Sequence, residues 1–218
     1  MMAGYRHAFI AAAVIGFAAH GQDHQAEAAD RISLGTGVCT YDRDKMLSLD
    51  EQAFDQDTSN GGSGWRAVAA VPGCALVAAD LVRDYRDKHQ TTSTTLPWHE
   101  GQLRAGAGEV DEAIALMEAS RKPREEDLAG WNPYVDATIA FLRKDRDALM
   151  SAREQLASVS PTPDLPPVQD GYIELPVNDS QVMKIRWPPN IDVVDGLVRC
   201  FGKDYEIAYS NACRDDSP

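Results

Sequence analysis

Positive charge is scarce in this chain. Its 218 residues include 21 Lys and Arg against 34 Asp and Glu, which gives a net charge of −13. A protein this acidic is repelled by the phosphate backbone of nucleic acids and by anionic membrane surfaces. We therefore expect no nucleic-acid partner. Histidine is scarce as well, with five residues, which leaves little material for acid–base chemistry by imidazole.

Long apolar runs are also scarce, and the sequence has only one, residues 8–19. It follows an N-terminal stretch with one Arg and no acidic residue. As a helix it rises roughly 18 Å, too short for the roughly 30 Å hydrocarbon core of a bilayer. This arrangement is typical of a secretory signal peptide, although a buried N-terminal helix is the alternative. We expect a signal peptide over residues 1–28, cleavage after Gly21 or Ala28, no later membrane span, and a periplasmic or secreted protein.

The sequence has no Cys-x-x-Cys motif. Its four cysteines, Cys39, Cys74, Cys200 and Cys213, lack the spacing of zinc ligands, so we expect neither a metal nor a cofactor. In an oxidising compartment an even number of cysteines indicates two disulfides. We favour the nearest-neighbour pairs Cys39–Cys74 and Cys200–Cys213. A pairing that joins the two ends of the chain remains open.

No catalytic motif is complete. His99-Glu100 opens the zinc-protease signature, but Leu103 stands where that signature requires a second histidine on the same helical face. Ser63 lacks the second glycine of a hydrolase nucleophile elbow. The sequence therefore favours a protein without catalytic activity over an enzyme.

The apolar periodicity from residue 41 to residue 159 is helical. We expect helices over residues 43–57, 74–88, 97–107, 110–121, 131–143 and 146–158. Two amphipathic helices joined by a short turn leave an apolar face that only the next hairpin can bury. The predicted fold class is mainly α: a short stack of antiparallel helical hairpins over residues 39–159, with a small disulfide-stapled C-terminal extension.

Residues 98–117 carry small residues at regular spacing. Gly101 and Gly108 lie seven apart, Ala113 follows five later, and Met117 takes a large apolar position four beyond it. This segment resembles a tetratricopeptide repeat, whose unit is a 34-residue helical hairpin with small residues where the helices cross. The resemblance implies two packed helices that contact their neighbours in an array. An ordinary helical bundle is the alternative interpretation.

The following hairpin is a weaker copy of this pattern. Ala148 stands thirty-five residues after Ala113, but Asp136 occupies the place of Gly101. Residues 43–89 could form a third hairpin on architecture alone. The whole chain also resembles a group of uncharacterised exported bacterial proteins that share Trp-His-Glu-Gly, Trp-Asn-x-Tyr-Val-Asp and a cysteine-bearing C-terminal helix. That resemblance implies export and supplies no activity.

Proline breaks the helical pattern in residues 160–170, which we interpret as a stiff, extended linker. In the C-terminal segment, residues 171–218, the stretches 172–177 and 181–187 alternate like strands. Pro176 and Pro188 would confine them to sheet edges. A helix over 191–201 and a shorter one to Ala212 follow. We expect this segment to cap the helical stack.

The two clearest hairpins both open with aromatic and polar residues, and stacking would bring these to one end of the array. We interpret them as a binding pocket with aromatic walls; the alternative is packing between hairpins. The candidate binding residues are Trp98, His99, Glu100, Arg104, Trp131, Asn132, Tyr134 and Asp136. The predicted function is an exported scaffold that binds a protein or peptide partner. The alternative is a small periplasmic hydrolase that uses carboxylates, Glu100 or Asp136, near His99.

Overall fold

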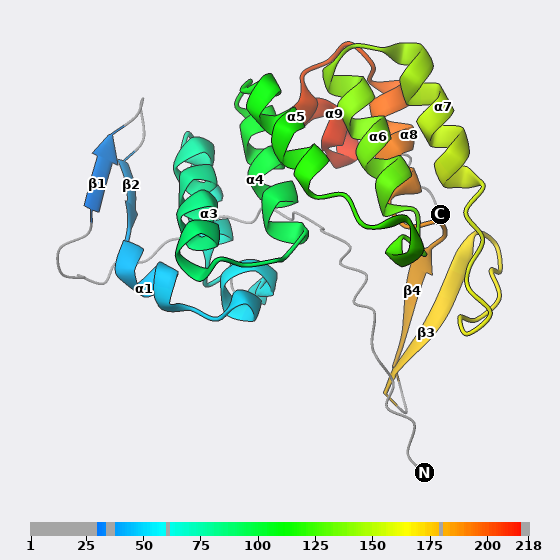
Figure 1. Ribbon diagram of the computed structural model, residues 1–218, viewed down its shortest axis with the longest axis horizontal. Coiled ribbons are helices and arrows are strands. Elements are labelled where there is room, and N and C mark those ends of the chain that lie inside the picture. Colours follow the sequence, from blue (N-terminus) through cyan, green and yellow to red (C-terminus); the bar gives the residue numbers. More distant parts are fainter. Residues whose placement is uncertain (1–29, 34–37, 60–61, 179–180, 215–218) are drawn as a thin grey trace.

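The computed structural model describes residues 30–33, 38–59, 62–178 and 181–214 (Figure 1). The predicted signal peptide lies outside these residues. The described chain is mainly helical, with two small two-stranded sheets, so the predicted mainly α class is confirmed. No helix within the described ranges is long and apolar enough to cross a bilayer.

The elements follow one another along the chain. The N-terminal part contains β1 (Asp30–Ser33), β2 (Val38–Tyr41), α1 (Arg43–Ser48), the π-helix η1 (Gln52–Gln56), α2 (Trp65–Ala69) and α3 (Ala75–His89). The central part contains α4 (Thr95–Gly106), α5 (Val110–Ala119), the 3-10 turn η3 (Arg124–Glu126), α6 (Trp131–Leu142) and α7 (Arg146–Ala157). The C-terminal part contains β3 (Tyr172–Asn178), β4 (Gln181–Arg186), α8 (Ile191–Arg199), α9 (Tyr205–Tyr209) and η4 (Asn211–Cys213).

Helices α3 to α7 lie side by side in chain order (Figure 1). The four predicted helices from residue 97 to residue 158 correspond to α4 to α7, with ends that differ by at most two residues. Capping explains part of this agreement, since the Asp145 side chain accepts a hydrogen bond from the Ala148 amide at the start of α7.

The α4–α5 crossing is as close as its small residues imply. A Cβ atom added to Gly101 would lie 3.1 Å from the Ala113 carbonyl oxygen and 3.2 Å from Met117 Cγ. Ala113 and Met117 are fully buried at this contact. Glycine therefore sets the distance between the two helices of this hairpin.

The region before α3 differs from the prediction. One helix was expected over residues 43–57, but the chain leaves the helical conformation at Leu49, and the Asp50 side chain accepts a hydrogen bond from the Ala53 amide at 2.8 Å to start η1. The short helix α2 was not predicted. It follows Gly64, where an added Cβ would lie 1.9 Å from the Phe54 carbonyl oxygen. The third hairpin over residues 43–89 is therefore wrong: only short elements precede α3, and the long helix that packs along α3 is α4.

Two hydrophobic clusters form the core. The first joins β2, α1, η1 and α2 to α3, with Phe54, Trp65 and Leu81 buried in it. The second joins α4 to α7 with α8 and α9. Helix α4 contributes to both, since Leu96 belongs to the first cluster and Trp98 to the second.

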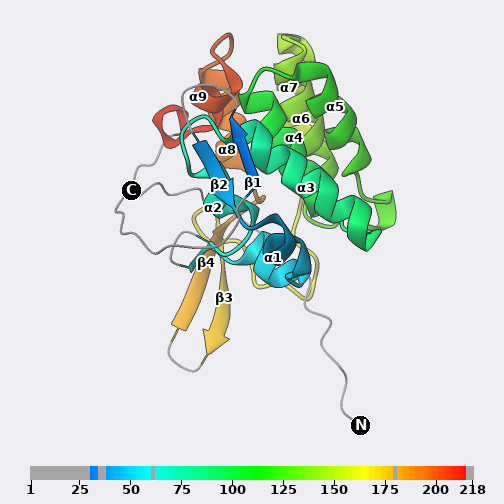
Figure 2. The same ribbon diagram turned by 90° about the vertical axis from the view of Figure 1, so that its left-hand side faces the viewer.

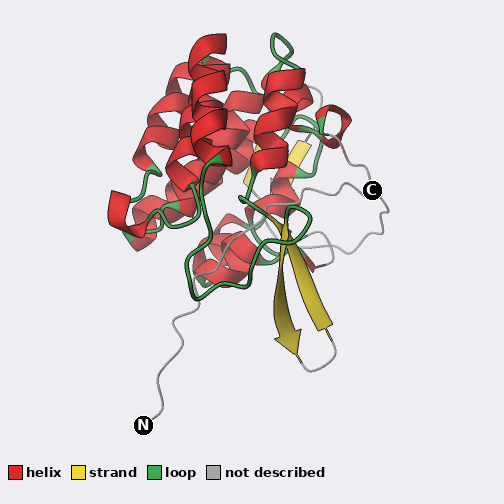
Figure 3. Cartoon of the chain, turned by 90° about the vertical axis from the view of Figure 1, so that its right-hand side faces the viewer, coloured by secondary structure: helices red, strands yellow, loops and turns green. Residues whose placement is uncertain are grey.

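Both predicted disulfides, Cys39–Cys74 and Cys200–Cys213, are present, so the pairing that joins the chain ends is wrong. Residues 160–170 contain no helix, in keeping with their prolines. Strands β3 and β4 pair antiparallel. Helix α8 packs against α6 and α7, and α9 reaches α4. The C-terminal segment therefore lies along one side of the array instead of covering only its last hairpin (Figures 1 and 3).

Candidate functional site

The eight candidate residues do not meet in one pocket. The aromatic ones pack on each other in the second cluster: the ring centroid of Trp98 lies 5.0 Å from that of Trp131 and 4.8 Å from that of Tyr134. Trp98 and Tyr134 are buried, and the Trp131 indole nitrogen donates to the Ser120 carbonyl oxygen at 2.8 Å. Burial, together with the nearby Tyr209, raises the pKa of Tyr134 well above its usual value. These rings fill the core instead of lining an open pocket.

Asn132 and Asp136 lie on α6 and face the end of α5. The Asn132 side chain accepts from the Lys122 amide at 3.0 Å and donates to the Lys122 carbonyl oxygen at 2.9 Å, which fixes the chain between the two hairpins. Asp136 is half-buried and pairs with Arg121 at 2.7 Å. Asn132 therefore has a structural role, whereas Asp136 borders the surface.

His99 lies on another side of α4, against η1 and α2. Its Nδ1 atom is 2.7 Å from Asp55 Oδ1, which also accepts a hydrogen bond from the Trp65 indole nitrogen at 2.7 Å. His99 is 3% exposed and Asp55 is 1% exposed. On the far side of the imidazole, an Arg66 guanidinium nitrogen lies 3.5 Å from Nε2, and the guanidinium stacks over the Trp65 ring. The contacts of the imidazole are therefore with buried protein groups.

The pKa of Asp55 is lowered by these contacts. Burial alone would raise it, but the hydrogen bond and charge of His99, the Trp65 N–H and the Arg66 charge together lower it below its usual value. Asp55 is therefore a buried carboxylate that joins three elements. The sequence gives no sign that Asp55 is a partner of His99, because the two residues are 44 positions apart and no local spacing connects them.

Glu100 and Arg104 form a second buried network. Glu100 is 2% exposed, and its oxygens accept from Arg86 at 2.6 Å and from Arg104 at 3.0 Å. Arg104 also pairs with Asp80 on α3 at 2.9 Å and with Glu109 at 2.6 Å. Burial opposes the charge of Arg104, but hydrogen bonds to the three carboxylates raise its pKa. This network joins α3, α4 and α5, and both Glu100 oxygens are occupied by arginine donors.

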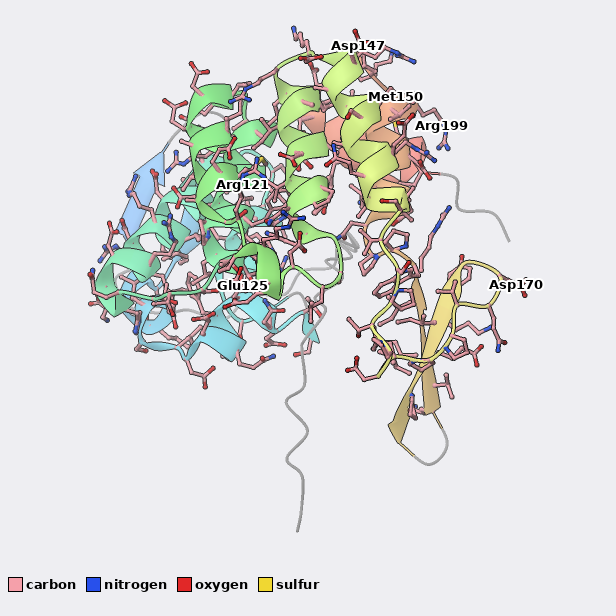
Figure 4. All side chains as sticks on the ribbon, turned by 45° about the vertical axis from the view of Figure 1, so that its right-hand side comes forward. Arg121, Glu125, Asp147, Met150, Asp170 and Arg199 are labelled. Carbon is pink, nitrogen blue, oxygen red and sulfur yellow. A yellow bond between two sulfur atoms is a disulfide. The ribbon has the colours of Figure 1, made fainter. Side chains whose placement is uncertain are left out.

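An open groove of about 270 Å³ lies between α5, α6 and α7. Asp136 is the one candidate residue in its lining. The polar part of the lining also includes Glu118, Arg121, Arg143, Ser151 and Gln155. Figure 4 labels Arg121 at the end of α5, beside α6. The groove could not be predicted from the sequence, because its side chains come from the outer faces of three helices and periodicity alone does not show how those faces meet.

The described residues contain no cluster of three or more His, Cys, Asp or Glu side chains that could hold a metal ion. No protein-family model matches the chain, and neither the curated proteins nor the solved structures show a significant similarity to it. The groove and the two buried networks are therefore interpreted from their own chemistry.

Proposed function

We propose that the protein is an exported module without catalytic activity that binds a peptide segment of a partner protein in the groove between α5, α6 and α7. The observation that carries this proposal is the groove itself, an open depression that three helices of the array share. The tetratricopeptide resemblance of residues 98–117 remains a prediction, and the proposal does not depend on it.

The lining of the groove suits an extended peptide. Its floor is apolar, with the nearly buried side chains of Ile139, Ala140 and Ala152. Its rim carries charged and amide groups that can fix the direction of a bound chain. Protein sites for small ligands and peptides combine an apolar surface with a few polar groups in this way.

Arg143 is the best candidate for a direct contact with the peptide. It is exposed, and within the described ranges it forms no ion pair, whereas Arg121 is held by Glu118 at 2.5 Å and by Asp136 at 2.7 Å. The charge of Arg143 is close enough to help lower the pKa of Glu118, after the larger effect of the Arg121 hydrogen bond. We therefore propose a peptide that brings a carboxylate to Arg143.

Export is supported by two observations of different kinds. The two disulfides are typical of a protein that folds in an oxidising compartment. The N-terminal sequence has the pattern of a signal peptide. Together they favour a periplasmic or secreted site of action.

Binding is a better use of the groove than hydrolysis. The described residues that line it include neither histidine nor cysteine. His99 and Glu100, on which the hydrolase alternative depends, are buried in the two networks of α4. A carboxylate whose two oxygens accept from arginines is poorly placed to transfer a proton to a substrate.

Site-specific photo-crosslinking tests the proposal. A photoreactive residue replaces Gln155, which lines the groove, or Glu154, which is exposed on the same helix outside the lining. In cells that produce the protein, we expect a discrete crosslinked product from position 155 and little or none from position 154. Equal products at both positions, or none at position 155, would contradict binding in the groove.

A charge reversal adds a second readout. Arg143→Glu should lower the melting temperature only slightly, because the side chain is exposed and makes no ion pair within the described ranges, although it loses its favourable charge interaction with Glu118. Loss of a charge-assisted hydrogen bond worth about 1.5 kcal/mol lowers affinity about tenfold. The crosslinked product at position 155 should fall accordingly. An unchanged yield would refute the contact with Arg143.

A further inference from the structure

The outer part of the β3–β4 hairpin stands apart from the helices, whereas its base contacts α8 through Arg186 and Asp195. It extends away from the array in three views (Figures 1, 2 and 3). Near its turn, Val182 is 58% exposed on one face and Met183 is 47% exposed on the other. Two-stranded hairpins are marginal by themselves and gain stability when further strands join them. An exposed strand edge offers its N–H and C=O groups to such a strand.

The register shows which groups point outward. The Trp187 amide donates to the Gly171 carbonyl oxygen at 2.8 Å, so these two residues form a hydrogen-bonded pair. Pairing alternates along an antiparallel ladder, and Met183 therefore bonds inward to its register partner Leu175. Val182 and Lys184 lie at the alternate positions, where the backbone groups of β4 point away from β3.

The outer edge of β3 is closed at two places. The amide and carbonyl of Tyr172 exchange hydrogen bonds with Gln169, at 2.9 and 2.8 Å. Pro176 lies at an outward position and has no N–H to donate. On β4, by contrast, no other strand pairs with the outer edge among the residues that the structure describes. The hairpin therefore has one open edge.

We propose that the open edge of β4 pairs antiparallel with β4 of a second copy of this chain, about a two-fold axis at Met183. In this register Val182 lies opposite Lys184 of the second copy, and Met183 lies opposite its own counterpart. Each Lys184 is already balanced by Glu174 of its own chain at 2.9 Å. This register therefore avoids placing like charges directly opposite each other, which would destabilise the pairing.

The charge of the hairpin allows a second copy as the occupant. The whole chain carries −13, so two copies repel each other over most of their surface. Residues 172–186 carry two acidic and two basic side chains and are neutral. The hairpin is thus a place where two copies can meet without this repulsion. Because the β3 edge is closed, pairing stops at two copies and gives a closed dimer with a four-stranded sheet.

Two proline variants of the full mature chain test this pairing. Lys184→Pro removes an outward N–H from β4, and Glu174→Pro removes the corresponding N–H from the closed edge of β3. Both variants lose the same ion pair, and both keep the inward hydrogen bonds of the hairpin. Circular dichroism checks that each variant is folded.

The mass in solution is measured by sedimentation from about 1 μM to about 1 mM, the range of weak to moderate affinities expected for a small strand interface. We expect the wild type and Glu174→Pro to approach twice the monomer mass as concentration rises, and Lys184→Pro to remain monomeric. A wild type that stays monomeric throughout, or a Lys184→Pro variant that dimerises like the wild type, would overturn the proposal.

Disulfide trapping gives an independent readout. All four native cysteines are paired, so a new cysteine is the one free thiol of the chain. Opposed side chains of a non-hydrogen-bonded pair have Cβ atoms about 4.5–5.5 Å apart, close to disulfide geometry. Met183→Cys should form a covalent dimer under mild oxidation much faster than Leu175→Cys, its register partner on β3. Equal rates for the two variants would contradict the two-fold axis.

This dimer is independent of the proposed peptide groove. Photo-crosslinking from position 155 should be unchanged in Lys184→Pro, because the groove lies on α5, α6 and α7. If the mass rises only when another protein is added, the occupant of the β4 edge is that protein and not a second copy, and the inference is overturned.

Discussion

The replacement of Asp55 by alanine gives the sharpest test of the buried network around His99. Asp55 accepts hydrogen bonds from the Trp65 indole nitrogen and from His99 Nδ1, both at 2.7 Å, and its backbone carbonyl accepts from Arg66 at 3.0 Å. Alanine removes the carboxylate but leaves these buried donors in place. Trp65 and His99 are each 3% exposed, so water does not replace the lost acceptor.

The expected cost follows from the number of donors left without a partner. A buried, unsatisfied donor costs about 1–3 kcal/mol, and two of them give about 4 kcal/mol. Removing one partner of a buried ion pair costs a similar amount, about 3–5 kcal/mol. Since a domain is stable by about 5–15 kcal/mol, Asp55→Ala should remove a large part of the free energy of unfolding.

Urea unfolding with the disulfides intact measures this effect, and tryptophan fluorescence reports it directly because Trp65 contacts the network. With a slope of about 2 kcal/mol per molar urea, the midpoint should fall by about 2 M. Asp87→Asn, at an exposed position of α3, is the control and should leave the midpoint unchanged. A shift for Asp55→Ala below about 0.5 M, which is about 1 kcal/mol, would refute the reasoning.

The pH dependence separates the charge of Asp55 from its size. The pKa of Asp55 is lower in the folded protein than in the unfolded chain, where it is about 3.9. Its charge therefore contributes stability fully above about pH 4, and this contribution is lost as the pH falls through the folded-state pKa. The gap in unfolding free energy between wild type and Asp55→Asn should be smaller at pH 3 than at pH 7. An equal gap at both pH values would show that the charge contributes nothing.

Five further variants test packing, the second network and the disulfide framework. Gly101→Val should lower the free energy of unfolding by about 1–3 kcal/mol, because the valine side chain would overlap α5. Gly106→Ala has open space around the added Cβ and should raise it by about 0.5 kcal/mol. Thermal unfolding compares the two variants. Glu100→Leu should lower the free energy of unfolding, measured in urea, by about 2 kcal/mol, because Arg86 and Arg104 both lose the Glu100 carboxylate. The loss is limited because Arg104 keeps its ion pairs with Asp80 and Glu109. Replacing Cys39 and Cys74 by alanine should cost about 4 kcal/mol, against about 3 kcal/mol for the C-terminal pair, since it opens the longer loop. If the measured free energies of unfolding do not change in these directions and relative sizes, the contacts from which the changes were predicted do not contribute as described.

The helices that the sequence predicts best are those with long periodic patterns and local signals. Asp145 caps the start of α7 in the α6–α7 hairpin, and Gly101 lies where the helices of the α4–α5 hairpin touch. The region before α3 was harder to predict because its elements are only five or six residues long and depend on tertiary contacts. Gly64 is an example: its need for glycine comes from the Phe54 backbone, which no periodic pattern indicates.

The candidate site could be predicted only in part. The sequence indicated which residues could carry chemistry but not which way their side chains face, because that depends on the elements that surround each helix. Asp136 and Asn132 lie four positions apart on α6, yet one borders the groove and the other fixes a loop. The sequence indicated the two strands but not that they pair with each other; the structure pairs them as β3 and β4, with Pro176 in a strand that has only one neighbour.

Helix α4 explains why the richest motif of the sequence is not an open site. Successive residues of an α-helix point about 100° apart, so four neighbours cover the whole circumference. Trp98 packs into the second cluster, His99 contacts Asp55, Glu100 contacts α3, and Gly101 contacts α5. A helix with neighbours on every side has no face left for a ligand, and its chemical variety serves the different neighbours. Binding surfaces are therefore better sought on elements with a free face or edge, and among the described residues these include the α5–α6–α7 groove and the open edge of β4.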